Sequence, residues 1–479
     1  MTVRLDGSGS TAGLRALPAL QRVLALADPG SVEPVSAALE AARPSKHLAR
    51  WGIAAQEDDG VVVARASVDG APILIAAQDE RFLGGSAGAN HSDALRQMFA
   101  VAAAERPAAV VLLAGSGGVR LHEANAAECA LARALSALLD LRASGIPVLV
   151  IGAADVFGGT AVLACSAERI ALFPGVRLGL SGPAVIETTR GKSELDAGDK
   201  GAVAAVFGAD AHAAAGHVEL LPDSAAAVRE WITKAARDSM PFATWVGTMH
   251  HKLGKRLATG EEARGMDSLQ PAGRPPAIPA NLALLFADTR PIDPAGWLAS
   301  IGGGAIWACR PVAGTFGPRE AHAMDEALLA HVAPAASRGS PTLLLVGDSL
   351  GHEVSRRAEA LCVPQYLAQH AAVIALLRAQ GVSVRGLLAG VGHSAELFAH
   401  VLQATDLHAF ADARVVAMEP AAVARVTRLP QADLMALIEN DPLLGQPVRH
   451  FARFAGMDIV ANADLAWLGL GGGERTASR

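Results

Sequence analysis

Two apolar runs, residues 108–115 (AAVVLLAG) and 147–153 (PVLVIGA), decide the predicted fold of this chain. Each run has the length and aliphatic content of a buried strand, and each is followed by a glycine turn. Helical segments come next, one over about residues 123–144 and one from about Thr160. Strands that alternate with helices in this way form parallel sheets wrapped by helices, so we predict an α/β fold.

The chain upstream of these runs predicts a hairpin and an entry segment. Two β-branched stretches within residues 60–77 meet at Asp69-Gly70, a dipeptide typical of hairpin turns. Leucines at near-helical spacing predict an N-terminal helical arm over residues 1–42. Prolines gather within residues 261–280 and predict a linker. The predicted domains are therefore 43–260 and 281–479.

The second half of the chain repeats the first at nearly constant spacing. Gly145 and Gly381 each open a strand that leads to a turn and a helix, at an offset of 236 residues. Pro107 and Pro341 precede matching apolar strands at an offset of 234. Downstream, the two units close at an offset of 237. We therefore predict two domains that are related to each other by an internal repeat.

Composition excludes several classes of function. Of the 479 residues, 51% are hydrophobic and 18% charged, so the chain folds and has enough length for two to four domains at roughly 150 residues each. A net charge of −6 gives no attraction to nucleic acid or to an anionic membrane. No apolar leader opens the sequence, and the four cysteines form no CxxC pair. We expect a cytoplasmic protein with no disulfide framework and no metal.

Two glycine turns are the candidate ligand-binding features. Gly117-Gly118 follows the first apolar run, and Phe157-Gly158-Gly159 follows the second. Glycine lets the backbone approach a ligand, and the helix that follows presents unpaired N–H groups with partial positive charge. Such a turn can hold an oxyanion. The alternative is that both turns are ordinary strand-to-helix connections.

Three familiar motifs give alternative interpretations of glycine-containing segments in this half of the chain. A dinucleotide fingerprint would need glycine at Arg120, and a phosphate loop ending at residues 191–193 (GKS) would need glycine at Ile186. Residues 84–88 (GGSAG) match the GxSxG elbow of serine hydrolases, but charged residues separate them from the preceding strand. The hydrolase function is therefore a minor alternative.

Several segments together resemble one enzyme family. The first half resembles the beta subunit of biotin-independent malonate decarboxylase, and the second half resembles its gamma subunit. The first-half segments are 81–86 (RFLGGS), 117–125 (GGVRLHEAN), 156–159 (VFGG) and 179–187 (GLSGPAVIE). The second-half segments are 345–348 (LVGD), Arg356-Arg357 with Glu359, 387–390 (LLAG) and 422–428 (AVARVTR). The resemblance covers about residues 45–454.

The resemblance implies two crotonase-like ββα superhelix domains, similar to the carboxyltransferase part of acyl-CoA carboxylases, with both subunits fused in one chain. It implies decarboxylation of a malonyl thioester to an acetyl thioester and carbon dioxide. The substrate would be carried on the phosphopantetheine-type group of an acyl-carrier protein or on coenzyme A, with no cofactor bound covalently to this chain. Implied partners are the acyl-carrier subunit and an acyl-transferase subunit, with a homo-oligomer also open.

The resemblance and the turns together select the candidate site residues. The enolate left by loss of carbon dioxide needs donors aimed at its oxygen. The candidate catalytic residues are Gly158, Gly159, Thr160, Ser394, Ala395 and His393. The candidate substrate-binding residues are Gly117, Gly118, Arg120, Gly182 and Pro183. His122, His393 and His400 are candidate proton donors, although a surface or core position is the more common role for such histidines.

The second half departs from the family pattern at its turn. The gamma-type turn usually reads Ser-Gly-Ala, whereas this chain has Ser394-Ala395-Glu396. A glutamate beside a carboxylate site would repel it unless the glutamate points away or is protonated. Two alternatives follow: the carboxyltransferase component of a biotin-dependent carboxylase, or a catalytically impaired scaffold that docks an acyl carrier.

Overall fold

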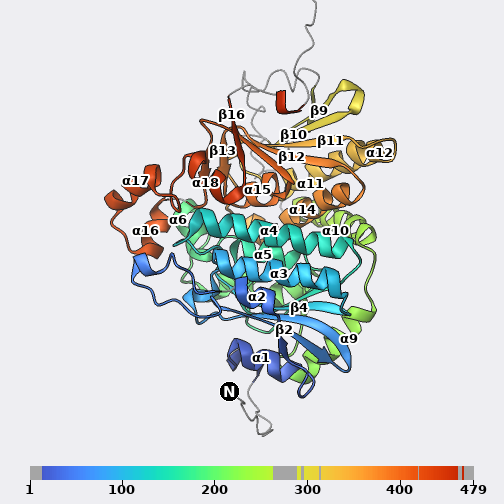
Figure 1. Ribbon diagram of the computed structural model, residues 1–479, viewed down its shortest axis with the longest axis vertical. Coiled ribbons are helices and arrows are strands. Elements are labelled where there is room, and N and C mark those ends of the chain that lie inside the picture. Colours follow the sequence, from blue (N-terminus) through green and yellow to red (C-terminus); the bar gives the residue numbers. More distant parts are fainter. Residues whose placement is uncertain are drawn as a thin grey trace, which may run out of the picture. The chain divides into compact units, whose positions relative to one another are not determined.

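The computed structural model describes residues 13–41, 43–262, 289–292, 296–311, 314–418, 420–461 and 466–468. The chain forms two compact units (Figure 1). Unit 1 comprises Met1–Arg120, Arg133–Trp245 and Val354–Gln365, and unit 2 comprises Leu121–Ala132, Val246–Glu353 and Tyr366–Arg479. Each unit therefore takes one short segment from the other half of the chain, which the sequence did not predict.

Unit 1 is built on a seven-stranded sheet whose strands lie side by side in chain order. The first three strands are antiparallel, and the strands from β3 to β7 are parallel. The predicted hairpin is confirmed: its turn is Asp69-Gly70, with φ of +51° and +79°. The strands are β1 (Glu33–Pro34), β2 (Val61–Val68), β3 (Ala71–Gln78), β4 (Ala109–Ser116), β5 (Val148–Val156), β6 (Arg169–Leu172) and β7 (Glu219–Leu220).

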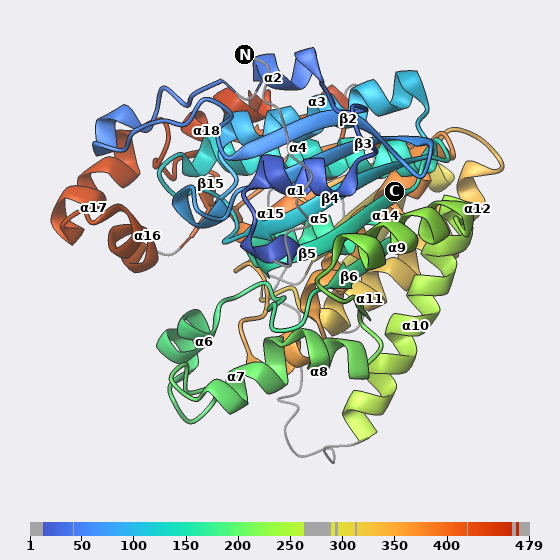
Figure 2. The ribbon, with the colours of Figure 1, turned by 90° about the horizontal axis from the view of Figure 1, so that it is seen from below.

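Helices cover both faces of this sheet. In Figure 1, α1 and α9 lie on one side and α3 and α5 on the other; seen from below, α1 lies in front of the strands (Figure 2). The helices of unit 1 are α1 (Ala19–Leu26), α2 (Ser36–Ala41), α3 (Ala89–Glu105), α5 (Gly158–Cys165), α6 (Pro183–Arg190), α7 (Lys200–Phe207), α8 (Ala209–Ala214), α9 (Ala225–Arg237) and α13 (Arg356–Ala360). Helix α4 (Ala124–Ala143) begins in unit 2 and ends in unit 1.

The predicted N-terminal arm belongs to the sheet of unit 1. Residues 1–12 and 42 lie outside the described residues. Within the rest, α1 buries Arg22, whose guanidinium forms an ion pair with Glu80. Strand β1 pairs with β2 at Glu33 and Arg65. The segment therefore packs as part of the unit, because a strand and a buried ion pair hold it there.

Unit 2 contains a second seven-stranded sheet and a short two-stranded one. The seven strands follow the order β16-β14-β12-β11-β10-β9-β8, with the β8, β9 and β10 pairs antiparallel and the rest parallel. The strands are β8 (Thr289–Ile292), β9 (Gly296–Ile301), β10 (Ile306–Pro311), β11 (Thr342–Gly347), β12 (Ser383–Leu388), β14 (Asp406–Phe410) and β16 (Asp458–Val460). β13 (Val391–His393) and β15 (Arg414–Val416) form the parallel pair.

The helices of unit 2 pack against its sheet and against each other, with α11 and α14 on one side of β10–β12 (Figure 1). They are α10 (Phe242–Glu262), most of which belongs to this unit, α11 (Pro318–Ala327), α12 (Ala333–Ala336), α14 (Val363–Ala379), α15 (Ser394–Ala399), α16 (Pro420–Thr427), α17 (Gln431–Asn440) and α18 (Val448–Ala455). Of the predicted proline-rich linker, residues 263–280 lie outside the described residues.

The predicted α/β class with parallel sheets is confirmed. Both sheets begin with three antiparallel strands and continue with parallel ones, and the strands after Pro107 and Pro341 occupy the same place in the two orders. This correspondence supports the internal repeat, which stays a prediction. Among the described residues, no helix is both long and apolar enough to cross a lipid bilayer.

Candidate functional site

Two predicted glycine turns touch each other in unit 1, where β4 and β5 end. A Cβ atom added to Gly158 would lie 2.9 Å from the Cα of Gly118, and one added to Gly118 would lie 3.2 Å from the Cα of Gly158. Their φ angles are +63° and +98°, a region that favours glycine. The structure therefore brings together two turns that lie 40 residues apart, and any side chain at either position would separate them.

Helix α5 begins at this contact and presents two donors. The cap residue Phe157 contributes no side-chain hydrogen bond, and the Gly158 N–H donates to the Leu180 carbonyl at 3.1 Å. Gly159 and Thr160 occupy the next two positions, whose N–H groups have no acceptor inside the helix. In the described part of the chain, no other acceptor is recorded for either N–H. These two donors carry the partial positive charge of the helix N-terminus.

Ser116 holds the turns in place. Its buried Oγ accepts a hydrogen bond from the Gly118 N–H at 3.1 Å and another from the Thr160 hydroxyl at 3.1 Å. Its carbonyl accepts from the Phe157 N–H at 2.8 Å. This role of Ser116 could not be predicted from the sequence, because serine is common in turns. The Gly159 and Thr160 N–H groups at the start of α5 are therefore held in position before a ligand binds.

A third loop, which carries Gly182 and Pro183, is attached to the same place. The Leu180 carbonyl of this loop accepts the hydrogen bond from the Gly158 N–H of α5. Gly182 is the cap residue of α6, and no atom lies within 4 Å of the position that a Cβ atom on Gly182 would occupy. The Leu180 and Ser181 N–H groups donate to the Glu359 carboxylate at 2.9 and 2.6 Å. Burial raises the pKa of Glu359 to about 8. Glu359 belongs to the segment that unit 1 takes from the second half, so sequence analysis did not place it here.

Arg120 differs from the other predicted substrate-binding residues. Its guanidinium is fully buried and lies 2.6 Å from the Asp59 carboxylate, which is equally buried. It also donates to the carbonyls of Asp59 and Ser86 and stacks over the Phe82 ring. These contacts favour a structural role for Arg120, so we do not include it among the groups that touch substrate.

The predicted second turn lies in unit 2. Ser394 and Ala395 begin α15, a helix of six residues, and His393 ends β13 and caps that helix. Ala395 is buried, and His393 is half-buried with its ring against Gly351, where an added Cβ would lie 2.5 Å from Nδ1. The roles of Ser394, Ala395 and His393 stay predictions.

Glu396, the departure from the family pattern, points into the interior of unit 2. Its side chain is fully buried, and the Ser349 hydroxyl donates to its Oε2 at 2.9 Å. Burial raises the pKa of Glu396 to about 8, so the carboxyl is neutral at pH 7. The repulsion that the sequence suggested therefore does not arise.

Glu396→Gln should flatten the pH dependence of stability. Between pH 4.5 and 8 only the folded state keeps the proton on Glu396, so the free energy of unfolding falls by up to about 1.4 kcal/mol per pH unit and stays low above pH 8. Glutamine is neutral at every pH, so the variant should be more stable than the parent at pH 8 by about 2 kcal/mol or more. Urea unfolding at pH 5 to 9, with the exposed Glu326→Gln as control, measures this; an unchanged slope would contradict it.

His400, a candidate proton donor, lies in a buried chain of polar groups. His370 Nδ1 is 2.6 Å from Asp325 Oδ1, and His370 Nε2 is 2.9 Å from His400 Nδ1. Burial holds the pKa of His400 far below its usual range and that of His370 at about 3. Both rings are therefore neutral, and His400 is unsuited to donate a proton at neutral pH.

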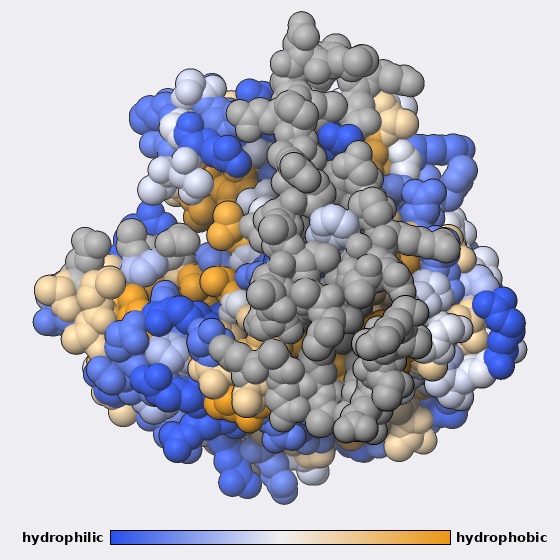
Figure 3. Space-filling model, turned by 90° about the horizontal axis from the view of Figure 1, so that it is seen from above, coloured by the Kyte–Doolittle hydropathy of each residue, from blue (hydrophilic) through white to orange (hydrophobic). Residues whose placement is uncertain are grey.

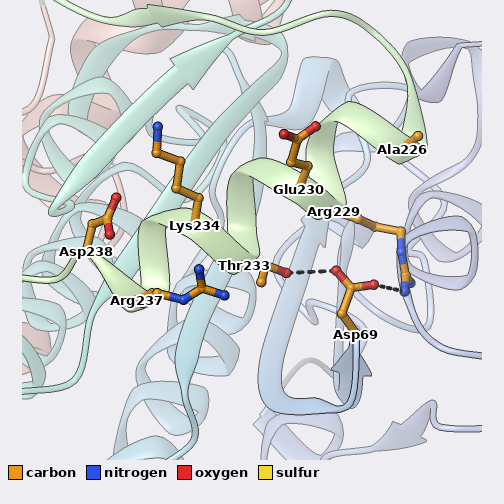
Figure 4. Close-up of a pocket in the computed structure, with 8 residues that line it drawn as sticks. All are labelled: Asp69, Ala226, Arg229, Glu230, Thr233, Lys234, Arg237 and Asp238. Atoms are coloured by element: carbon orange, nitrogen blue, oxygen red, sulfur yellow. Dashed lines mark hydrogen bonds and ion pairs between the residues drawn. The ribbon is translucent and has the colours of Figure 1, made fainter.

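One open depression, of about 730 Å³, lies along α9 (Figure 4). Asp69 accepts hydrogen bonds from Arg229 and from the Thr233 hydroxyl. The walls of the depression carry three basic and three acidic side chains, whose formal charges cancel: Arg229, Lys234, Arg237, Asp69, Glu230 and Asp238. A balanced wall does not attract a phosphate or carboxylate, so we do not place the substrate here.

Apolar side chains reach the surface near α16 and α17 of unit 2. Met418, Val426 and Met435 are 36%, 43% and 50% exposed. Figure 3 shows tan and orange atoms on the left, where Figure 1 places these helices. Scattered apolar side chains are ordinary on protein surfaces, so this patch does not by itself indicate a binding site.

Two family models match the chain. Residues 16–235 match the carboxyl transferase domain, and residues 314–468 match the malonate decarboxylase gamma subunit. The first region contains the contact between the glycine turns, and the second contains Ser394 and Ala395.

Individual relatives match parts of the chain. The malonyl-S-ACP:biotin-protein carboxyltransferase MADC of Malonomonas rubra is 34% identical over 174 residues, which are 33% of this chain and 55% of that protein. The acetyl-coenzyme A carboxylase carboxyl transferase subunits beta/alpha of Parafrankia sp. (strain EAN1pec) are 35% identical over 185 residues, 36% of this chain and 30% of that protein. This chain thus spans about half or less of these two relatives.

A solved structure is similar as well. The Pseudomonas malonate decarboxylase hetero-tetramer in complex with malonate has a chain that is 33% identical, with a TM-score of 0.45. The match covers 48% of this chain and 85% of that one.

Proposed function

We propose that this chain, whose two regions match the carboxyl transferase domain and the malonate decarboxylase gamma subunit, decarboxylates a malonyl thioester. One observation carries the proposal: at the start of α5, beside the Gly118–Gly158 contact, the Gly159 and Thr160 N–H groups have no acceptor among the described residues. The substrate is a malonyl group on the phosphopantetheine-type arm of an acyl-carrier protein or on coenzyme A.

The reaction places charge on the thioester oxygen. The bond between the carboxylate carbon and the α-carbon breaks, carbon dioxide leaves, and the electron pair moves into the thioester to form an enolate. The Gly159 and Thr160 N–H groups receive this oxygen as its charge grows. A preorganised donor of this kind is typically worth about 3 kcal/mol in the transition state. A proton from solvent or from a nearby group then adds to the α-carbon and gives the acetyl thioester.

Other predicted residues have supporting roles in this proposal. The backbones of Gly117, Gly118 and Gly182, which carry no side chains, form with Pro183 the wall against which the thioester lies. Ser394, Ala395 and His393, which lie in unit 2, stay candidate catalytic residues on the basis of the sequence resemblance. Glu396 does not argue against this assignment, since its buried carboxyl is neutral.

A second candidate function is transfer of the carboxyl group to biotin on another chain. It is favoured by the match to the Malonomonas rubra protein, whose name describes that transfer, and by the carboxyl transferase region. Partners in either case are an acyl-carrier subunit and an acyl-transferase subunit, and a homo-oligomer remains part of the proposal.

The test uses the purified full-length chain with malonyl thioester on a carrier protein and on coenzyme A, with and without added biotin. A decarboxylase forms acetyl thioester and carbon dioxide at the same rate in both, whereas a transferase forms acetyl thioester only with biotin and leaves the carboxyl group on it as carboxybiotin. Acetyl thioester that appears only with biotin, in an amount equal to the carboxybiotin formed, would overturn the proposed function in favour of the second candidate.

A further inference from the structure

Three buried side chains of unit 1, His212, His217 and Cys362, form what we call the His-Cys cluster. Their ligand atoms, one from each residue, all lie within 4.8 Å of one another. The three residues are 2%, 6% and 1% exposed. None of them belongs to the turns described above. The cluster was not visible in the sequence, because Cys362 lies 145 residues beyond His217.

The imidazole of His212 is arranged as that of a metal-binding histidine is. His212 Nε2 lies 3.0 Å from the Leu178 carbonyl oxygen, and its Nδ1 lies 2.9 Å from His217 Nδ1. A carbonyl oxygen only accepts, so in the neutral ring the proton of His212 is on Nε2 and Nδ1 carries a lone pair. A backbone carbonyl that accepts from the second ring nitrogen is the usual support of a histidine ligand, because it fixes the tautomer.

A fourth donor lies beside the cluster. Cys165, the last residue of α5, is buried, and its side chain hydrogen-bonds with that of Cys362. Cys362 itself has a φ of +60°, a strained value for a residue with a side chain. Strain of this kind is retained where surrounding structure demands a particular side-chain position.

We propose that the His-Cys cluster and Cys165 bind a zinc ion as a closed structural site. Two imidazoles and two thiolates are a common zinc ligand set, and softer sulfur ligands disfavour magnesium and calcium. At typical Zn–N and Zn–S lengths of about 2.0 and 2.3 Å, tetrahedral ligand atoms are roughly 3.3–3.8 Å apart. The ligand atoms of His212, His217 and Cys362 lie at most 4.8 Å apart, with 2.9 Å between the two Nδ1 atoms, so shifts of roughly 1 Å would bring these three to tetrahedral separations.

The ion would tie together three parts of unit 1. Cys165 ends the helix whose first turn carries the Gly159 and Thr160 donors, and His212 lies in α8. Cys362 lies in Val354–Gln365, the segment that also holds Glu359 against the Leu180 and Ser181 N–H groups. The zinc would fasten this borrowed segment to the unit that contains the catalytic turn. This inference does not depend on the proposed reaction.

Metal content of the full-length chain tests the proposal. The protein is produced in zinc-supplemented medium, purified without chelators and measured by mass spectrometry of the metals. Metal-free protein is then titrated with Co²⁺, whose thiolate charge-transfer absorption reports a Co–S bond. Cys362→Ala and His217→Ala remove ligands, and Cys309→Ala, at a buried cysteine of unit 2, is the matched control.

The proposal expects about one zinc per chain in the parent and in Cys309→Ala, and less than a tenth of that in Cys362→Ala. The parent should show the thiolate–cobalt absorption, and a chelator should lower its melting temperature. A parent that holds no zinc and shows no such absorption overturns the proposal, as does Cys362→Ala with the zinc content of the parent. If the variants do not fold, the thiolate–cobalt absorption of the parent chain decides whether the cluster binds a metal through sulfur.

Discussion

Gly159→Pro should slow decarboxylation of malonyl thioester by about 10²–10³-fold while the protein remains folded. Proline has no N–H, so the change removes one of the two donors at the start of α5. Proline is tolerated in the first turn of a helix, because the N–H lost there makes no helical hydrogen bond. We therefore expect the variant to lose stabilisation of the transition state, and hence rate, while its folding stability changes little.

Gly159→Ala is the matched control, because alanine keeps the N–H and is the better helix former by about 1 kcal/mol. We expect it to retain most of the activity if its methyl group clears the substrate. The rate constant for carbon dioxide release and the melting temperature are measured for both variants. A proline variant within threefold of the alanine variant would show that this N–H does not stabilise the enolate.

Arg120→Met should cost about 3–5 kcal/mol of folding stability, because it leaves the buried Asp59 carboxylate without its partner. Both side chains are fully buried, so solvent does not compensate the charge. A loss of this size is a large share of the roughly 5–15 kcal/mol that stabilises a domain. We therefore expect a large fall in melting temperature or in soluble yield.

The double variant Asp59→Asn with Arg120→Met should recover part of this loss, since no unpaired charge remains. Arg81→Met is the control, because Arg81 is 56% exposed in its pair with Asp79 and such pairs contribute little. In the fraction of Arg120→Met that folds, the KM for malonyl thioester should equal that of the parent chain. A raised KM with an unchanged melting temperature would instead support the substrate-binding role predicted from the sequence.

The strands and the two glycine turns could be predicted because their signals are local. Residues 108–115 and 147–153 are continuous apolar runs that form β4 and β5, and Asp69-Gly70 makes the hairpin turn. Glycines that follow adjacent parallel strands meet at one edge of the sheet, so the Gly118–Gly158 contact follows from the fold.

What the sequence did not reveal depends on residues far apart in the chain. Segment Val354–Gln365 joins unit 1 and brings Glu359 to the Leu180 N–H and Cys362 to His212. No local pattern marks such a segment, because α13 is only five residues long. The neutral state of Glu396 likewise arises from burial beside Ser349, which comes from a different strand end. Arg120 resembled a ligand-binding arginine until its partner Asp59 was located.

Decarboxylation in D₂O reports on the enolate itself, because the α-carbon takes a deuteron from solvent or from a group that exchanges with solvent. The full-length chain is incubated with malonyl thioester on its carrier, and the acyl product is weighed by mass spectrometry. We expect an acetyl thioester that carries one deuterium on its methyl group, in an amount equal to the carbon dioxide released. Free malonate without carbon dioxide would mean thioester hydrolysis, and unreacted malonyl thioester would mean no decarboxylase; either result would rule out decarboxylation through an enolate.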